Sequence, residues 1–356
     1  MTATSNIQTV GWRTVDDLAV VSVRFNGKHE DIRDHLATLS GSVGSRACGH
    51  PFVLYRGGGD MEVCLPVTEP TDGGVYTLDG GLMMCAPFEG EMGSGEAGDA
   101  LGRAFGDLWR YTLEHHIGVT EEPWREVFLD YDPESGGAYQ AELQVPMLLP
   151  KWLGRLREGL DRHAGVSVAK HVLGGSECLS PSSDTAEKVA WMKGAMARLD
   201  SAVKDEGARR KIMCGCAHVY PAAHIAKLKS DYERLGSVDA LIDDIAKDPG
   251  YTGAPYYRDP DRDGNVVFID KVPQEREKHA EATDPVERRA AACHCPVIKA
   301  AILAGEDISP TFCGCATGWF KPLWEAIVGA PVEVVCEESV LQGHDRCRFA
   351  IYLPEE

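Results

Sequence analysis

FVLYRGGGDMEVCLPV, residues 52–67, is the stretch that decides the fold of the first half of the chain. Apolar side chains occupy every second position along residues 60–67. They are Met61, Val63, Leu65 and Val67. Strict alternation predicts a β-strand with one face packed against a core. Phe52–Tyr55 is a second, shorter strand pattern, and Gly57-Gly58-Gly59 ends it.

A strand and a helix precede this stretch, and the same unit then recurs. Residues 18–25 are rich in β-branched side chains, which predicts a strand, and residues 29–39 carry apolar residues at helical spacing. The second copy consists of the strand pattern 81–88, the helix pattern 97–115, and the strand patterns 125–129 and 141–147. Phe88-Glu89-Gly90 also echoes Phe25-Asn26-Gly27. The first half is therefore predicted to be a duplicated strand–helix–strand–strand module.

The second half mixes helix and strand patterns. Helices are predicted at 152–164, 185–208, 222–235, 237–246, 297–304 and 320–328, and strands at 265–271, 331–341 and 346–353. The last two strands are expected to form a hairpin, and residues 249–264 have loop composition. Pro322 is compatible with the last helix only in its first turn. The fold class predicted for the whole chain is α+β.

Length and composition narrow the classes of protein. A chain of 356 residues predicts two domains, and it contains no apolar run long enough to span a membrane. The first 15 residues do not have the pattern of a signal peptide, so a cytoplasmic location is expected. The net charge is −19, and residues 1–150 hold 9 Lys and Arg against 23 Asp and Glu. Such an acidic half argues against nucleic-acid binding and suits a cationic ligand. An acidic surface also keeps a protein soluble, which is the simpler explanation of the charge.

Five motifs of the first half together resemble the GyrI-like small-molecule-binding domain, the effector-binding part of many AraC- and MerR-type regulators. They are the segments 51–55, 60–67, 88–90, 124–129 and 141–147, and the resemblance covers residues 17–150. It implies two related α+β modules that enclose an aromatic-lined groove for apolar, often cationic compounds, as in multidrug binding. Only 16 residues precede this region, too few for a helix-turn-helix, so we expect a stand-alone binder without direct nucleic-acid contact.

The resemblance also points to particular side chains in that groove. Glu126 and Glu142 are expected to attract a cation, and in some stand-alone relatives glutamates at these motif positions act as acid and base on strained electrophilic compounds. Both glutamates could equally lie on a solvated sheet face. Glu62 is a further candidate ligand contact. The candidate aromatic walls, each of which could also be plain core, are Tyr55, Phe88, Trp109, Tyr111, Trp124 and Phe128.

Three Cys-x-Cys pairs dominate the second half, namely Cys214 with Cys216, Cys293 with Cys295, and Cys313 with Cys315. If their backbone is extended, each pair aims two sulfurs to one side. The pairs could bind zinc or another soft metal, form a redox dithiol, or lie buried as reduced thiols. His218 and His294 are additional candidate metal ligands.

Residues 190–356 resemble an uncharacterised bacterial Cys-rich family that is similar to 4-vinyl-reductase-like and aminothiazoline-carboxylate-hydrolase-like domains. The residues that carry this resemblance are Cys293–Pro296, Ser309–Cys315 and Gly343–Phe349, whereas the spacing at 214–218 departs from the family pattern. It implies a second small-molecule-binding α+β domain and metal binding through cysteines. The residue pattern itself predicts that 151–189 is a helical connection between the two domains.

The first hypothesis from the sequence is a small-molecule-binding protein with a metal-binding, cysteine-rich domain. The alternatives are a detoxifying hydrolase that uses Glu126 and Glu142, a thiol- or metal-dependent enzyme, and a regulator that meets DNA through a partner chain. No pattern in the sequence indicates an oligomeric state.

Overall fold

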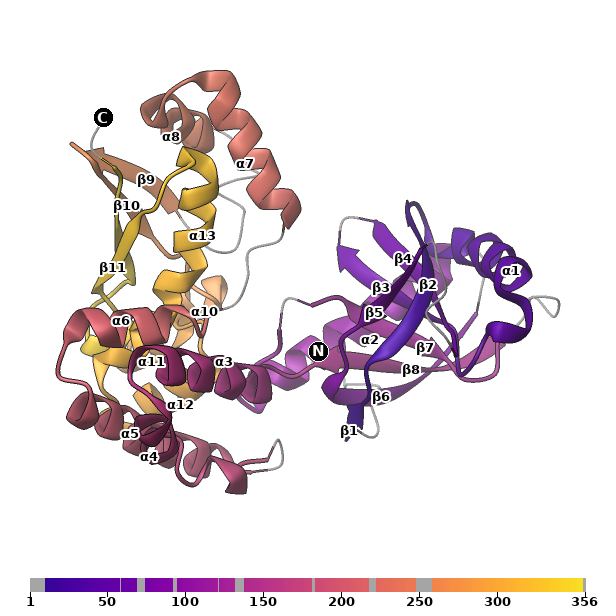
Figure 1. Ribbon diagram of the computed structural model, residues 1–356, viewed down its shortest axis with the longest axis horizontal. Helices are drawn as coiled ribbons and strands as arrows, with labels where there is room; N and C mark the ends of the chain where they lie inside the picture. The colour runs from indigo at the N-terminus through magenta and orange to yellow at the C-terminus, as the bar shows by residue number, and fades with distance from the viewer. Residues whose placement is uncertain are drawn as a thin grey trace. The chain divides into compact units, whose positions relative to one another are not determined.

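The computed structural model describes residues 10–57, 59–68, 74–91, 95–120, 122–131, 138–180, 183–217, 222–247 and 258–354. The chain divides into two compact units, Met1–Leu148 and Leu149–Glu356, each of which is described by itself (Figure 1). The finer division of the second half at 151–189 and 190–356 stays a prediction. Within the described residues, no helix is both long and apolar enough to cross a bilayer.

The first unit is built on an eight-stranded antiparallel sheet. Its strands are β1 (Gly11–Val15), β2 (Leu18–Asn26), β3 (Phe52–Gly57), β4 (Asp60–Pro66), β5 (Val75–Leu78), β6 (Gly81–Glu91), β7 (Trp124–Phe128) and β8 (Ala138–Pro146). The order across the sheet is β1-β6-β8-β7-β3-β4-β2-β5. The helices are α1 (Ile32–Val43), preceded by the short η1 (His29–Asp31), and α2 (Gly95–Glu114).

This architecture confirms the predicted duplication. One module is β2-α1-β3-β4 and the other is β6-α2-β7-β8, and α1 packs on the first while α2 packs on the second. The strands β1 and β5 were not predicted. They occupy the two edges of the sheet, where short segments with half-exposed side chains have no strong alternation to reveal them.

The two faces of this sheet carry different side chains. The face under the helices is apolar, with Val53, Val63 and Phe128 in one cluster with the buried positions of α1. On the opposite face, Phe52 and Leu54 form a smaller buried cluster with Val20 and Cys64. Because side chains alternate between faces along a strand, the pairing register decides which face each polar residue joins.

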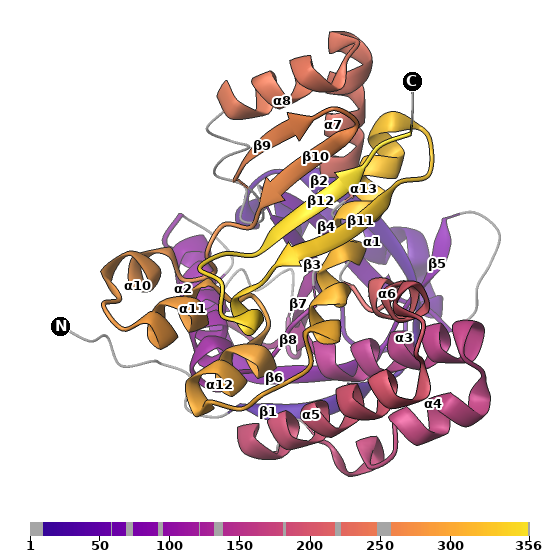
Figure 2. The ribbon, with the colours of Figure 1, turned by 90° about the vertical axis from the view of Figure 1, so that its left-hand side faces the viewer.

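The second unit combines a helical layer with a four-stranded antiparallel sheet. Its helices are α3 (Leu148–His163), α4 (Val166–Val172), α5 (Thr185–Ala202), α6 (Glu206–Cys214), α7 (Ala222–Leu235), α8 (Val238–Lys247), α10 (Arg276–Glu281), α11 (Pro285–Ala292), α12 (Pro296–Ala304) and α13 (Thr317–Val328). Its strands, β9 (Arg258–Asp263), β10 (Val266–Asp270), β11 (Glu333–Glu338) and β12 (Arg348–Tyr352), have the order β11-β12-β10-β9, with α13 packed against β11 and β12 (Figure 2).

The pairing of β11 with β12 confirms the predicted hairpin. Other expectations for this half were wrong. The helix predicted over 185–208 ends at Ala202, and a new helix begins after Asp205, whose carboxylate accepts a capping hydrogen bond from the Ala208 N–H at 2.6 Å. The loop predicted over 249–264 contains the strand β9. The first part of that predicted loop, residues 249–257, lies outside the described residues.

Pro322 does not lie in the first turn of its helix. The helix α13 begins at Thr317, three residues before the predicted start, so Pro322 is an interior residue. Its missing N–H leaves the carbonyl four residues earlier, that of Gly318, without its usual helical donor. The preceding 3-10 helix η4 (Pro310–Ala316) runs directly into α13, and this continuity was not visible in the apolar spacing.

Candidate functional site

Glu126 is a fully buried carboxylate of the first unit. It lies on the central strand β7, is 0% exposed and projects to the face under the helices, because it pairs with Val53 and Leu143. The Tyr55 hydroxyl donates to its Oε2 at 2.5 Å and the Tyr139 hydroxyl to its Oε1 at 2.5 Å. One carboxylate is thereby held by phenols from the two strands that flank β7.

The neighbourhood of Glu126 is poor in positive charge. Among the described residues, the one basic side chain within 4 Å is His29, whose Nε2 lies 3.3 Å from Oε2. Burial, reinforced by the nearby carboxylate, raises the pKa of Tyr55 and of Tyr139 well above the ordinary value, so both stay protonated donors. The His29 Nδ1 is buried and has no hydrogen-bond partner among the described residues.

Aromatic rings continue outward from this carboxylate. Phe105 of α2 lies edge-on to Tyr55, with ring centroids 5.5 Å apart, and 5.3 Å from Trp124. Trp124 in turn approaches Trp109, which is 39% exposed, at 6.4 Å. The chain of rings therefore connects the surface to the side chain next to Glu126. We call Tyr55, Phe105, Trp109 and Trp124 the aromatic shell.

The remaining predicted aromatic walls have other surroundings. Phe128 is fully buried in the core beside Tyr139, with centroids 5.1 Å apart. Phe88 is half-buried, 6.3 Å from the Tyr139 ring. Tyr111 of α2 stacks on His115, which follows the end of that helix, with ring centroids 3.9 Å apart. Phe88 thus borders the tyrosines that hold Glu126, whereas Phe128 is core.

Glu142 lies on the opposite face of the sheet from Glu126. The register pairs Glu126 with Leu143 and Val127 with Glu142, so the two carboxylates point away from each other across the sheet. Glu142 instead accepts hydrogen bonds from Arg13 at 2.5 Å and from Gln144 at 2.7 Å. This register corrects the hypothesis of a paired acid and base, because carboxylates on opposite faces cannot reach one substrate.

Glu62 also belongs to the opposite face, and it is fully partnered. Ser22, Tyr76 and Arg56 donate to it at 2.6, 2.8 and 2.5 Å. Burial opposes ionisation, but the hydrogen bonds from these three donors lower the pKa of Glu62. The carboxylate therefore ties β4 to its neighbours, and it does not approach the aromatic shell.

His29, Phe105 and Tyr139 were missed as site residues. The strand β8 begins at Ala138, three residues before the predicted start, and this extension includes Tyr139. Tyr139 has the same parity as Ala141 and Leu143, so a longer predicted strand would have placed it on their face of the sheet. No pattern in the sequence singled out His29, which precedes α1 in η1.

The Cys-x-Cys pairs of the second unit differ in backbone conformation. Cys293 and Cys295, on either side of His294, both have extended backbone. Cys313 and Cys315 instead lie in η4, and Cys214 is the last residue of α6. Residues two apart on a helical backbone point in different directions, so these pairs do not aim both sulfurs to one side.

All twelve cysteines are free thiols. Burial, with Cys347, Cys295 and Cys315 nearby, raises the pKa of Cys313 to about 12. Burial likewise raises the pKa of Cys315 to about 12, with Cys295 and Cys214 among its neighbours. The second unit thus brings several buried or half-buried thiols near one another and keeps them protonated.

These thiols do not form a ready-made ligand group. Among the residues that the structure describes, no three His, Cys, Asp or Glu side chains are placed to share a metal ion. His218 lies outside the described residues, and the Nε2 of His294 is 2.6 Å from the carbonyl oxygen of Val272. The donor chemistry suits a soft metal, but the side-chain positions do not yet fit one.

The chain matches no protein-family model, and no curated protein is similar to it in sequence. Solved structures with partial similarity include EcmrR in a cryo-EM complex with DNA, at a TM-score of 0.33 and 16% identity over 39% of this chain and 56% of that chain. The crystal structure of the EcmrR C-terminal domain has a TM-score of 0.30 and 16% identity over 39% and 96%. SAV2435 bound to tetraphenylphosphonium has a TM-score of 0.27 and 17% identity over 40% and 96%.

Proposed function

We propose that the first unit binds small lipophilic cations, with Glu126 as the charge partner and the aromatic shell as the apolar wall. The carrying observation is a carboxylate with 0% exposure that is held by two tyrosine hydroxyls and has His29 as its nearby basic group. The proposal places this unit in the GyrI-like class of small-molecule binders and makes binding, not catalysis, its activity.

Two physical arguments support a cation over other ligands. A buried carboxylate whose charged partner is absent destabilises a protein by about 3 to 5 kcal/mol. A cation that binds next to the carboxylate supplies that partner, and its binding therefore offsets part of this cost. Aromatic faces also attract cations, by roughly 0.5 to 2 kcal/mol per ring. The surplus of acidic residues in the first 150 positions would raise the local concentration of a cation further.

Two probes of matched shape test this proposal in the wild-type protein. Tetraphenylphosphonium, which SAV2435 binds, and tetraphenylborate have the same four phenyl groups and opposite charges. We expect the cation to quench the fluorescence of Trp124 and Trp109 saturably. We expect the anion to bind at least roughly tenfold more weakly, because its negative charge is repelled by the carboxylate. Equal affinity for the two ions would mean that the site recognises only the apolar surface of the ligand, and it would refute the proposal.

We also propose a thiol centre in the second unit, either a site for zinc or another soft metal or a redox dithiol. Its support is the proximity of Cys293, Cys295, Cys313 and Cys315 to one another and to Cys347, with Cys293 buried and the other three half-buried. Because these side chains do not form a metal-ligand group as they stand, no chemical step is assigned to them.

Elemental analysis of protein purified without oxygen tests the metal form of this proposal. We expect stoichiometric metal in the wild type and its loss in the double variant Cys313→Ser/Cys315→Ser, since thiolates are the ligands that soft metals prefer. Cys178→Ser is the matched control, because Cys178 is exposed. A double variant with unchanged metal would remove Cys313 and Cys315 from the metal site. A metal-free wild type would leave only the redox form, which thiol titration under a defined glutathione ratio would then decide.

A further inference from the structure

His29 approaches the Glu126 carboxylate from the short helix η1. Its Nε2 lies 3.3 Å from the Glu126 Oε2 and 3.4 Å from the Tyr139 hydroxyl oxygen, and its side chain is 8% exposed. Imidazole is the side-chain group whose charge ordinarily changes between pH 5 and 8. The Glu126 site therefore contains a group of its own that can be either neutral or positive.

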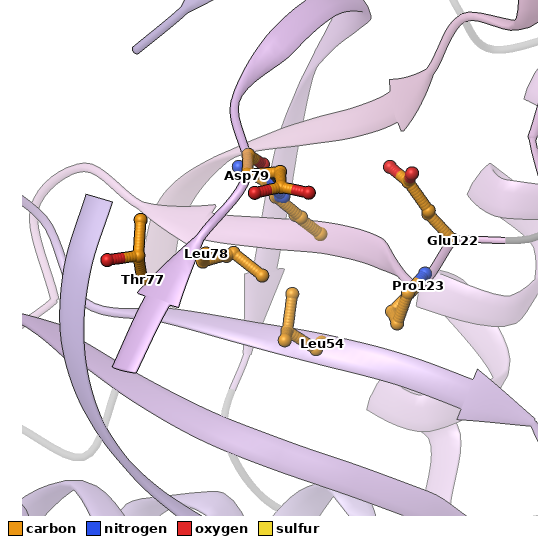
Figure 3. Close-up of a pocket in the computed structure, with 7 residues that line it drawn as sticks. Leu54, Thr77, Leu78, Asp79, Glu122 and Pro123 are labelled. Carbon is orange, nitrogen blue, oxygen red and sulfur yellow. Dashed lines mark hydrogen bonds between the residues drawn. The ribbon is translucent and has the colours of Figure 1, made fainter. Parts of the chain in front are cut away.

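The arginine next to Glu126 on β7 does not balance its charge. Arg125 pairs with Leu54, and because neighbouring residues of a strand point to opposite faces, its side chain lies on the other face of the sheet from Glu126. There its Nη2 donates to the Asp79 carbonyl oxygen at 2.7 Å. Arg125 lines a pocket on that face together with Leu54, Leu78 and Asp79 (Figure 3).

The helices that pack against η1 supply no charge partner either. The titratable side chains that α1 and the described part of α2 carry are Arg33, Asp34, His35, Asp99, Arg103, Asp107, Arg110, Tyr111 and Glu114. Among the described residues, none of these side chains hydrogen-bonds or forms an ion pair with His29 or Glu126. Around η1 itself, Glu30 lies 3.5 Å from the Lys28 ammonium group, and Asp31 accepts from the Lys28 N–H at 2.8 Å.

The protonation state of His29 therefore determines the charge that Glu126 and its neighbours present to a ligand. When the imidazole is neutral, the carboxylate keeps a net negative charge inside the protein, where the low dielectric strengthens its attraction for a cation. When the imidazole is protonated, an imidazolium lies 3.3 Å from the carboxylate and the pair is neutral overall. An additional cation then gains much less from the site.

We propose that His29 sets the charge preference of the Glu126 site, because cation binding and protonation of His29 oppose each other. This inference rests on the function proposed for Glu126 and adds its regulation by pH. Linkage fixes the sign of the effect: the affinity for a cation rises with pH, and binding of a cation releases protons. At acid pH the site keeps its apolar wall and loses its preference for positive charge.

Tetraphenylphosphonium and tetraphenylborate test this inference in the full-length wild type, because the charge of neither ion depends on pH in this range. The observable is the ratio of their affinities at about pH 8 and about pH 5.5, on either side of the ordinary imidazole transition. We expect the ratio to fall roughly tenfold on acidification, within the range of ordinary coupling between two sites. Calorimetry near pH 6.5, in buffers of different ionisation enthalpy, is expected to show proton release when tetraphenylphosphonium binds.

His29→Gln assigns the response to this side chain. The variant carries no titratable group at this position, so we expect its affinity ratio to stay at both pH values near that of the wild type at about pH 8. His35→Gln is the matched control: it makes the same change in α1, where the His35 ring lies 4.1 Å from the ring of Phe25, and should retain the full response. Thermal unfolding verifies that each variant is folded, and His29→Asn replaces His29→Gln if that variant is not.

The outcomes separate this inference from the function on which it rests. A strong cation preference at about pH 8 that persists at about pH 5.5 would overturn the role of His29 and leave cation binding at Glu126 intact. A pH response that survives in His29→Gln would also overturn it, because Glu126 or another group would then be the one that titrates. Equal affinity for the two ions at about pH 8 would overturn both proposals.

Discussion

Glu126→Gln is expected to weaken tetraphenylphosphonium binding roughly thirtyfold, the equivalent of about 2 kcal/mol for a lost interaction with a charged group. The variant keeps the shape of the side chain and can still accept from Tyr55 or Tyr139, so the shell is preserved. Only the negative charge is removed. Tryptophan fluorescence titration measures the affinity, and thermal unfolding verifies that the first unit remains folded.

Glu142→Gln is the matched control, because it makes the same chemical change on the other face of the sheet. Its partner Arg13 is about half exposed and can be hydrated when the charge is lost. We expect tetraphenylphosphonium affinity within about twofold of the wild type. Equal losses in the two variants would show that overall acidity, and not Glu126, attracts the cation.

The alternation of residues 60–67 and the repeated motif around Gly27 and Gly90 were sufficient to predict the duplicated module. The faces of its polar residues were not predictable. Residues 129–137 join β7 to β8, and the length of this connection leaves the register open. A shift of one residue between these strands would exchange the faces of Glu142 and Leu143. The paired-glutamate hypothesis therefore failed on register, which is a tertiary property.

The second unit shows which local signals were present and overlooked. Asp205 before Glu206 is an N-cap pattern that marks the start of α6. Ser309 followed by Pro310 is another, and the Ser309 hydroxyl accepts from the Thr311 N–H at 3.2 Å. Reading that second cap would have placed Cys313 and Cys315 on a helical backbone and removed the expectation that their sulfurs share a side. The strand β9 has no such signal, because RDPDRD is polar throughout.

Gly318→Ala is expected to destabilise the second unit by about 3 kcal/mol, at the upper end of the cost of overpacking. A Cβ at Gly318 would lie 1.8 Å from the Cys214 carbonyl oxygen and 2.7 Å from the Ala217 Cβ. Backbone atoms cannot rotate away, so α6 and α13 would have to separate. The change would also move Cys214 relative to η4, where a Cβ at Gly314 would lie 3.2 Å from the Met213 Cβ.

Gly154→Ala is the control that isolates the clash from the general effect of replacing glycine in a helix. A Cβ at Gly154 in α3 meets nothing within 4 Å, so this variant should gain roughly 0.5 to 1 kcal/mol from helix propensity. Urea unfolding followed by Trp319 and Trp324, which lie in the core of the second unit, measures both changes. Opposite signs for the two variants, with faster labelling of Cys216 in Gly318→Ala alone, would establish that contact between α6 and α13 keeps the thiols buried. If Gly318→Ala leaves the free energy of unfolding unchanged, α6 and α13 can separate at little cost. The thiol region could then also rearrange to bind a metal at little cost.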